Sequence, residues 1–254
     1  MIGIYFSGTG NSKYCLDNFL KVCNPQSNAY AIEEPQCINE IQKHEEIVFA
    51  YPVQYSNIPK IVKDFIVAHK ELWSGKTVFV IATMGLFSGD GAGILARLLK
   101  SYGANISGGL HVLMPDSISD EKVLKHSYAK NKERIAQALV KVEKAALLYK
   151  EGTPTREGLH IGSHIAGLFG QRLYFYHRTK HYRSNLKIDI DNCTGCGTCV
   201  KLCPMKNLSL SKHKALASSS CTMCYRCISQ CPNKAITLLG KRVIEQYHIK
   251  HYVE

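Results

Sequence analysis

The chain has 254 residues, enough for two modest domains. Apolar residues make up 45% and charged residues 20%, close to the average of globular proteins, which excludes a disordered or collagen-like chain. The formal net charge is +12, so we expect an anionic partner, cofactor or surface. The eleven cysteines are unevenly placed, because eight of them lie between Cys193 and Cys231.

The start of the chain bears on the cellular compartment. Residues 1–7 lack the basic start, long apolar stretch and cleavage site of a secretory signal peptide. No window reaches the roughly 18 continuous apolar residues that a membrane-spanning helix needs. We therefore expect a cytoplasmic protein without a membrane span. In that compartment, clustered cysteines bind metal more often than they form disulfides.

Residues 1–150 alternate short apolar runs with helical patterns, which indicates βαβ units around a parallel sheet. The predicted strands are 1–6, 47–51, 77–82 and 108–114. The predicted helices begin at residue 11 and span 59–68, 91–102 and 120–149. We therefore predict an α/β domain over residues 1–150.

Residues 151–185 have a different composition, which is basic, aromatic and rich in histidine. Apolar side chains recur there at helical spacing, at Ile161, Ile165, Leu168, Phe169 and Tyr176. One interpretation is a basic amphipathic helix that binds a membrane or a partner. We favour a connector helix packed between two domains, because its apolar face must otherwise be hidden from water.

Residues 186–254 contain an internal repeat. Residues 193–204 are CTGCGTCVKLCP, and residues 221–232 are CTMCYRCISQCP. A short alternating segment precedes each copy and another follows it, which predicts a pseudo-twofold domain. A unit of this size buries little core, so we expect bound metal to stabilise it.

Both cysteine runs have the spacing C-x2-C-x2-C-x3-C-P, which is typical of proteins with two [4Fe-4S] clusters. Three cysteines of a run bind one cluster, and the fourth binds the cluster of the other run. We assign one cluster to Cys193, Cys196, Cys199 and Cys231, and the second to Cys221, Cys224, Cys227 and Cys203. A zinc ribbon has paired C-x2-C knuckles instead, and disulfides do not suit the expected compartment.

A glycine-containing loop follows the first predicted strand and opens a helix. It consists of Ser7, Gly8, Thr9, Gly10, Asn11 and Ser12. Hydroxyls and free backbone N–H groups at a helix N-terminus form an anion site. Lys13 replaces the third glycine of a dinucleotide-binding motif, and the Gly-Lys-Ser/Thr of nucleotide-hydrolysing loops is missing. The loop therefore suits a terminal monophosphate.

This loop resembles the FMN-phosphate loop of flavodoxins. With the cysteine runs, the whole chain resembles a fusion family in which a flavodoxin-like domain precedes a two-cluster ferredoxin domain. The resemblance implies a doubly wound, parallel, five-stranded flavodoxin-like sheet followed by an α+β ferredoxin-like domain. It also implies FMN and two [4Fe-4S] clusters as cofactors, with residues 7–12 at the phosphate.

By the same resemblance, the loops after the third and fourth strands hold the flavin ring. In an open doubly wound sheet, ligands lie beyond the carboxyl ends of the strands, which supports this placement. The candidate residues are Pro52, Val53, Tyr55 and Asn57 in one loop and Thr83, Met84, Gly85, Phe87 and Gly91 in the other. Tyr55 and Phe87 either stack on the ring or cap the core.

We predict an electron-transfer protein that passes electrons between FMN, the two clusters and an external redox partner. One alternative is a flavin-dependent reductase or dehydrogenase, with the ferredoxin domain as electron inlet or outlet. Another is a regulatory iron-sulfur module whose flavodoxin-like domain binds no flavin. We assign no catalytic residue, because no nucleophile or acid-base motif accompanies the cofactors.

The positive charge is concentrated near the cysteines. Residues 186–254 carry ten Lys and Arg against four Asp and Glu. The basic residues around the runs are Lys201, Lys206, Lys212, Lys214, Arg226 and Lys234. Two clusters and a flavin phosphate offset about half of the total charge. The remainder favours a mildly acidic redox protein over nucleic acid, for which the aromatic interleaving is missing.

Overall fold

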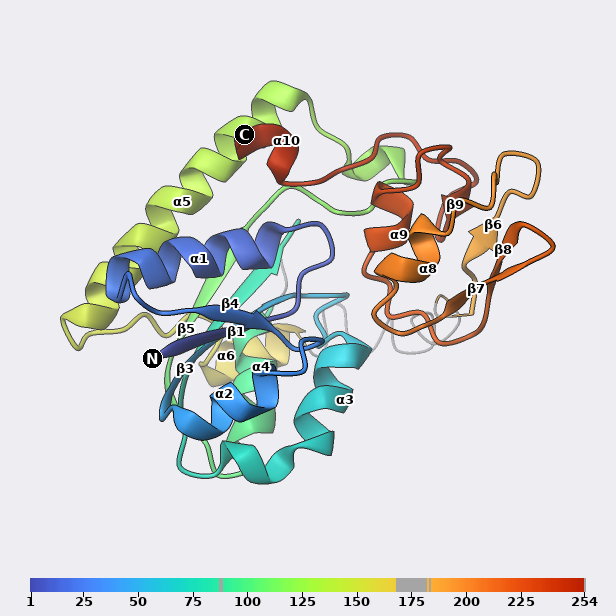
Figure 1. The fold of residues 1–254 in the computed structure, drawn as a ribbon. Coiled ribbons are helices and arrows are strands. Elements are labelled where there is room, and N and C mark those ends of the chain that lie inside the picture. The colour runs from blue at the N-terminus through green and yellow to red at the C-terminus, as the bar shows by residue number, and fades with distance from the viewer. Residues whose placement is uncertain (87–88, 168–181, 183, 254) are drawn as a thin grey trace.

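The computed structural model describes residues 1–86, 89–167, 182 and 184–253. Its larger part is a parallel sheet of five strands in the order β2-β1-β3-β4-β5 (Figure 1). The strands are β1 (Ile2–Tyr5), β2 (Ala29–Ala31), β3 (Glu46–Pro52), β4 (Thr77–Met84) and β5 (Asn105–Leu113). This is the strand order of flavodoxin-like doubly wound folds, so the predicted fold class is confirmed.

Helices cover both faces of the sheet. Those of the α/β part are α1 (Asn11–Cys23), α2 (Cys37–Lys43), α3 (Lys60–Ala68), α4 (Gly91–Lys100), α5 (Tyr128–Lys150) and α6 (Ile161–Gly167), with short 3₁₀ turns η1 (Lys70–Trp73) and η2 (Lys122–Leu124). Helices α1 and α5 pack on one face, and α2, α3 and α4 on the other (Figure 1). Within the described residues, no helix is long and apolar enough to cross a membrane.

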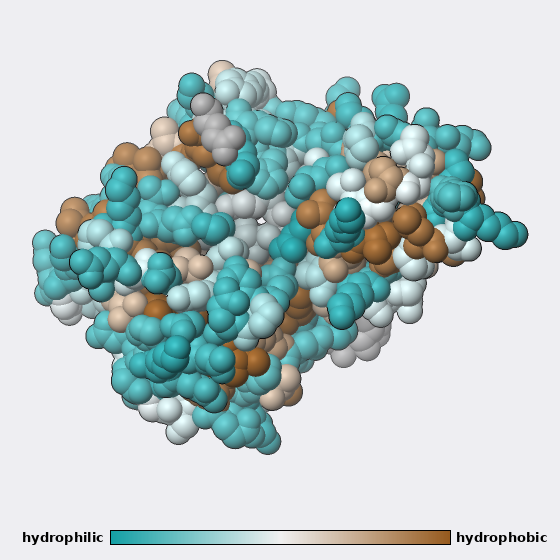
Figure 2. Space-filling view, viewed as in Figure 1, coloured by the Kyte–Doolittle hydropathy of each residue, from teal (hydrophilic) through white to brown (hydrophobic). Residues whose placement is uncertain are grey.

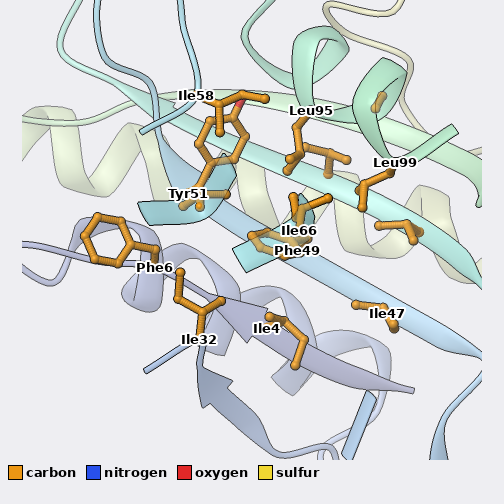
Figure 3. Close-up of a cluster of buried hydrophobic side chains, with 14 of the residues drawn as sticks. Ile4, Phe6, Ile32, Ile47, Phe49, Tyr51, Ile58, Ile66, Leu95 and Leu99 are labelled. Carbon is orange, nitrogen blue, oxygen red and sulfur yellow. The ribbon is translucent and has the colours of Figure 1, made fainter. Parts of the chain in front are cut away.

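The alternation of side chains along β3 explains the two cores. Ile47, Phe49 and Tyr51 point to the face covered by α3 and α4, as Figure 3 shows. Val48 and Ala50 point to the opposite face, against α1 and α5. All five side chains are at most 1% exposed, so this strand is buried on both sides, as its continuous apolar sequence predicted.

Three details of the α/β part differ from the sequence prediction. Strand β2 and helix α2 were not predicted, because one is three residues long and the other seven. Helix α5 begins at Tyr128 and not near residue 120, because Ser127 caps it by accepting a hydrogen bond from the N–H of Lys130 (3.3 Å). Residues 114–127 instead run across the carboxyl end of the sheet.

The predicted connector begins beside the sheet. The N–H of Gly109 in β5 donates to the carbonyl of Thr155 (2.8 Å), and the N–H of Glu157 donates to the carbonyl of Gly109 (2.9 Å). In α6, the side chains of Ile161 and Ile165 are 80% and 52% exposed. The other predicted apolar positions, Leu168, Phe169 and Tyr176, lie outside the described residues, so the role of the connector stays a prediction.

The cysteine-rich part is a small α+β unit with the predicted pseudo-symmetry. Its elements are β6 (Lys187–Ile188), α8 (Thr198–Leu202), β7 (Leu208–Ser211), β8 (Lys214–Ala217), α9 (Arg226–Ser229) and β9 (Ile236–Thr237), and a last helix, α10 (Lys250–Val253), lies beside α5 (Figure 1). Strand β6 precedes the first cysteine run and pairs with β9, which follows the second. Strands β7 and β8, between the runs, pair with each other. Each pair therefore joins one copy of the repeat to the other.

Candidate cofactor cavity and cysteine sites

A cavity of about 500 Å³ lies at the carboxyl end of the sheet. This volume is within the usual range for cofactor sites. Eleven of the fifteen predicted cofactor residues line it: Ser7, Gly8, Thr9, Asn11, Ser12, Pro52, Val53, Tyr55, Thr83, Met84 and Gly85. Gly10, Asn57 and Gly91 do not line it, and Phe87 lies outside the described residues.

The loop from Ser7 to Asn11 joins β1 to α1 and has free donors. Gly10 has a φ of 96°, which glycine adopts at low cost, and no side chain caps the first turn of α1. Among the described residues, none accepts a hydrogen bond from the backbone N–H of Gly8 or Gly10. Uncapped donors at a helix N-terminus attract an anion, so the loop fits a phosphate group.

The side chains of this loop are fixed by neighbouring strands. The Thr9 hydroxyl is 2.7 Å from the hydroxyl of Ser117, and the Ser12 hydroxyl is 2.7 Å from that of Thr83. The Asn11 amide donates to the carbonyl of Pro115 (2.9 Å). These contacts tie the loop to the ends of β4 and β5, which gives it a defined shape.

The loop after β3 makes a tight turn that presents Tyr55 to the cavity. Tyr55 and Ser56 have φ values of 51° and 55°, as the central residues of a type I′ turn require. The Tyr55 ring lies 5.9 Å from the ring of Tyr182, which also lines the cavity. Asn57 has a different role, because its side-chain oxygen accepts the N–H of Ile58 (2.9 Å).

The loop after β4 contributes mainly its first residues. Thr83, Met84, Gly85 and Leu86 line the cavity. Gly91, at the start of α4, is buried farther inside, where its carbonyl accepts the Tyr51 hydroxyl (2.5 Å). A Cβ at Gly85 would displace the carboxyl of Asp116, so glycine here allows the two loops to approach closely.

A third loop, residues 114–121, also lines the cavity and was missed in the sequence. It contributes Met114, Pro115, Asp116, Ser117 and Ile118. Burial raises the pKa of the Asp116 carboxyl above its usual value, although the N–H of Ile118 donates to it (2.8 Å). The only sequence indication was position, since the loop follows the carboxyl end of β5.

The second cysteine run forms one wall of the cavity. Met223, Cys224 and Tyr225 line it together with Leu238 and Leu239. The run is held by the loop after β3, because the Gln54 amide donates to the carbonyls of Thr222 (3.0 Å) and Met223 (3.1 Å). It also touches the glycine loop, where a side chain at Gly8 would collide with the carbonyl of Cys224.

Comparison of the two repeat copies identifies a specialised feature of this wall. Gly195 and Gly197 in the first run have φ values of 70° and 76°. The equivalent residues of the second run are Met223 and Tyr225, which keep φ values of 55° and 60°. A left-handed backbone costs a residue with a side chain about 1 kcal/mol or more. The second run thus has two residues with side chains, Met223 and Tyr225, in a left-handed backbone conformation, and both line the cavity.

The eight clustered cysteines gather around two separate hollows, one beside each run. Cys193, Cys196, Cys199 and Cys231 line the first hollow, and Cys203, Cys221, Cys224 and Cys227 line the second. Each hollow therefore combines three cysteines of one run with the last cysteine of the other. None of the eight forms a disulfide, so this donor set fits the thiolate ligation of iron-sulfur clusters.

Backbone donors already point at the sulfur atoms. The N–H of Asn207 donates to Cys203 Sγ (3.3 Å), and the N–H of Ala235 donates to Cys231 Sγ (3.4 Å). These two bonds occupy equivalent positions of the repeat. Hydrogen bonds to sulfur stabilise the charge of a cluster and raise its reduction potential.

The two hollows differ in their exposure to solvent. Burial raises the pKa of the Cys224 thiol to about 12, so this residue is a neutral thiol unless a metal binds it. Cys196, at the first hollow, is exposed, and its pKa is lowered by hydrogen bonding with Thr198. Cys224 also lines the large cavity, so the second hollow adjoins the cavity and the first does not.

Comparison with known proteins agrees with the cysteine sites. Residues 185–232 match a family described as a 4Fe-4S dicluster domain, which confirms the prediction of two [4Fe-4S] clusters. No curated protein matches the sequence.

Several solved structures are similar to the α/β part. The flavodoxin of Megasphaera elsdenii in its two-electron reduced form has 18% identity and a TM-score of 0.43, over 57% of this chain and 98% of its own. A flavodoxin from the domain Archaea has 14% identity and a TM-score of 0.42, over 60% and 96%. The Trp repressor binding protein of Bacillus subtilis has 16% identity and a TM-score of 0.42, over 57% and 96%.

The strand order and the family match together define the class of protein. The chain combines a flavodoxin-like α/β fold with a C-terminal 4Fe-4S dicluster domain, as the resemblance to the fusion family predicted. The two parts share the cavity, because residues from both of them line it.

Proposed function

We propose that this chain is an electron-transfer protein that binds FMN in the shared cavity and two [4Fe-4S] clusters in the cysteine hollows. The observation that carries the proposal is the position of Cys224, which lines both the cavity and the second hollow. A cofactor in the cavity and a cluster in this hollow are therefore separated by little more than one residue. Such proximity favours electron exchange between them.

The proposed ligands follow the grouping of the thiols. Cys203, Cys221, Cys224 and Cys227 hold the cluster next to the cavity, and Cys193, Cys196, Cys199 and Cys231 hold the outer cluster. Each cluster exchanges single electrons, and FMN exchanges one or two. The chain is thus suited to convert between one-electron and two-electron donors.

The proposed FMN site is composed of three loops. Free N–H groups of the glycine loop, with the hydroxyls of Ser7 and Thr9, bind the phosphate. Tyr55 and Met84 provide flat or polarisable surfaces for the ring. Tyr225 of the dicluster domain and Leu238, which follows this domain, also line the cavity. The proposed flavin site thus adjoins the cysteine run that holds the second cluster, which favours electron transfer to the cluster over reduction of a small molecule.

The outer cluster is the proposed contact point for a partner. Cys196 is exposed, and Ile190, Leu210 and Leu216 nearby are 58%, 47% and 50% exposed. Figure 2 shows apolar surface on this part of the molecule, at the right of the view. Lys187, Lys201, Lys206 and Lys212 of the same part of the chain are exposed, as are Asp189 and Asp191. An exposed apolar patch on a part of the chain with excess positive charge suits a mildly acidic one-electron redox protein, and the cluster chemistry suits a reducing compartment such as the cytoplasm.

Anaerobic reconstitution of the full chain tests the proposal. We expect about eight iron and eight sulfide per chain, and flavin absorption bands after the addition of FMN. Electrons supplied to the clusters by a reduced ferredoxin-like protein should bleach the flavin bands. Steady-state turnover of NAD(P)H or a quinone would favour the reductase instead. Failure to bind FMN in excess would refute both flavin-based functions.

A further inference from the structure

We infer that the dicluster domain shapes the phosphate loop, so that Arg226 and the C-terminal segment 243–253 are positioning elements for FMN. This inference rests on the proposed function, because it concerns how that site binds its cofactor. The observation behind it is that two carbonyls of the glycine loop accept hydrogen bonds from the C-terminal part of the chain, one from Arg226 in the dicluster domain and one from Ile249, which follows this domain.

Arg226 provides the first of these contacts. It lies between Cys224 and Cys227 in the second run, but its guanidinium reaches across to the α/β part. Its Nη2 donates to the Ser7 carbonyl (2.9 Å) and to Glu33 Oε1 (2.7 Å). Its Nη1 donates to the carbonyl of Leu202, next to Cys203 (3.4 Å). Arg226 is thus a bridge between the cysteine run and the glycine loop, and not the surface docking residue predicted from the sequence.

The C-terminal segment provides the second contact. After β9 the chain returns to the α/β part and ends beside α5 (Figure 1). On the way, the N–H of Ile249 donates to the Thr9 carbonyl (3.0 Å), and the Tyr247 hydroxyl donates to Asn11 Oδ1 (2.6 Å). Both Tyr247 and Ile249 are at most 5% exposed, so this segment is firmly packed over the loop.

The geometry of the peptide bond connects these contacts to the phosphate. In a trans peptide the C=O and the following N–H point in opposite directions, and the described chain has no cis peptide. Holding the Ser7 carbonyl toward Arg226 turns the Gly8 N–H away from it. Holding the Thr9 carbonyl toward Ile249 turns the Gly10 N–H away likewise. These are the two glycine donors that no described residue accepts.

The positions of Arg226 and Ile249 make a sharp test possible with the full holoprotein. Replacement of Ile249 by proline removes the N–H that Thr9 accepts, whereas replacement by alanine removes only the side chain. Ile249 precedes α10, which begins at Lys250, so proline at this position removes no N–H that the helix itself uses. Arg226→Gln removes the guanidinium, and Arg226→Lys keeps the charge without the fork of donors. Arg242→Gln changes an exposed arginine of the same domain and is the control.

Quenching of flavin fluorescence on binding measures the affinity for FMN and for riboflavin, which lacks the phosphate. We expect Ile249→Pro, Arg226→Gln and Arg226→Lys each to weaken FMN binding about tenfold, while riboflavin affinity changes less than twofold. Arg242→Gln should bind FMN as the wild type does, and Ile249→Ala should lose less affinity than Ile249→Pro, because it keeps the N–H that donates to Thr9. Iron analysis verifies that the clusters are retained, and Ile249→Pro decides the test if an Arg226 variant loses iron.

Three results would overturn the inference. One is wild-type FMN affinity in Ile249→Pro and Arg226→Gln. Another is wild-type FMN affinity in Arg226→Lys. This result would mean that the positive charge attracts the phosphate and that the guanidinium hydrogen bonds do not position the loop. The third is an equal loss of FMN and riboflavin affinity. A wild-type chain that binds no FMN would instead refute the proposed function itself, so the two failures are distinguishable.

Discussion

Asp120 links the third cavity loop to the dicluster domain, and its replacement by asparagine should loosen that link. Asp120 Oδ2 accepts the N–H groups of Leu238 (2.6 Å), Leu239 (2.9 Å) and Gly240 (3.2 Å), and Oδ1 accepts the Tyr225 hydroxyl (2.9 Å). The asparagine oxygen can still accept the three N–H groups, and its amide can donate to the tyrosine. Only the charge is lost, which weakens each N–H bond by about 1 kcal/mol.

The weakening of the three bonds lowers the free energy of unfolding by about 3 kcal/mol, and the easier burial of the uncharged amide offsets part of this loss. We expect a net loss of about 2 kcal/mol, which lowers the unfolding temperature by about 4–8 °C in a chain of this size. The fluorescence of Trp73, which is fully buried and the only tryptophan, reports the transition. Asp191→Asn, at an exposed position, is the control. A midpoint within 1 °C of the wild type would refute the argument that Asp120 holds the domains together.

Four further predictions follow from the cavity and its surroundings. Burial raises the pKa of Asp116, so its carboxylate destabilises the fold increasingly as the pH rises from the unfolded value of 3.8 through the folded pKa. The unfolding temperature of Asp116→Asn relative to the wild type should therefore increase as the pH is raised from 3.8 through the folded pKa. With FMN bound in the cavity as proposed, the same variant should raise the flavin potential by tens of millivolts in a spectroelectrochemical titration, because a negative charge that lines the cavity is removed. His111 Nε2 accepts the N–H of Ala92 (3.0 Å), and burial lowers the pKa of His111. The neutral imidazole therefore stabilises the fold above pH 6.5, and this stabilisation is lost as the pH falls from 6.5 through the folded pKa. His111→Gln should flatten the unfolding-temperature profile below pH 6.5. Cys224→Ser should lose about half the iron while Cys23→Ser keeps all of it, and equal iron content would contradict the assigned ligand.

The α/β part was predictable where its sequence is long and periodic. Strands β1, β3 and β4 are continuous apolar runs, and helices α3 and α4 have regular apolar spacing. Strand β2 was not predictable, because its three residues are only half buried at the edge of the sheet and carry no alternation. The loop around Asp116 was missed for a different reason. Its residues match no motif, and they reach the cavity only because β5 ends there.

The grouping of the cysteines could be predicted, whereas their relation to the cavity could not. The spacing alone implies that each hollow takes its fourth cysteine from the other run. It does not indicate which hollow adjoins the cavity. That depends on contacts over more than 100 residues of sequence, such as Gln54 with Met223 and Asp120 with Tyr225. Contacts of this range leave no local pattern.

The repeat itself nevertheless distinguishes its two copies. Position 195 requires glycine, because any Cβ there would collide with the carbonyl of His213. The second copy has methionine at the equivalent position and tyrosine two residues later, both with a left-handed backbone that disfavours them. An unfavourable backbone conformation persists only where other interactions of the residue compensate for its cost. The side chains of Met223 and Tyr225 both line the cavity, where such interactions are available. Replacing Met223 and Tyr225 by glycine should therefore relieve the backbone yet enlarge the cavity and weaken flavin binding. The first copy has glycine at both positions and its hollow shares no residue with the cavity, so the difference between the copies marks the hollow that would lie nearer a cofactor bound in the cavity.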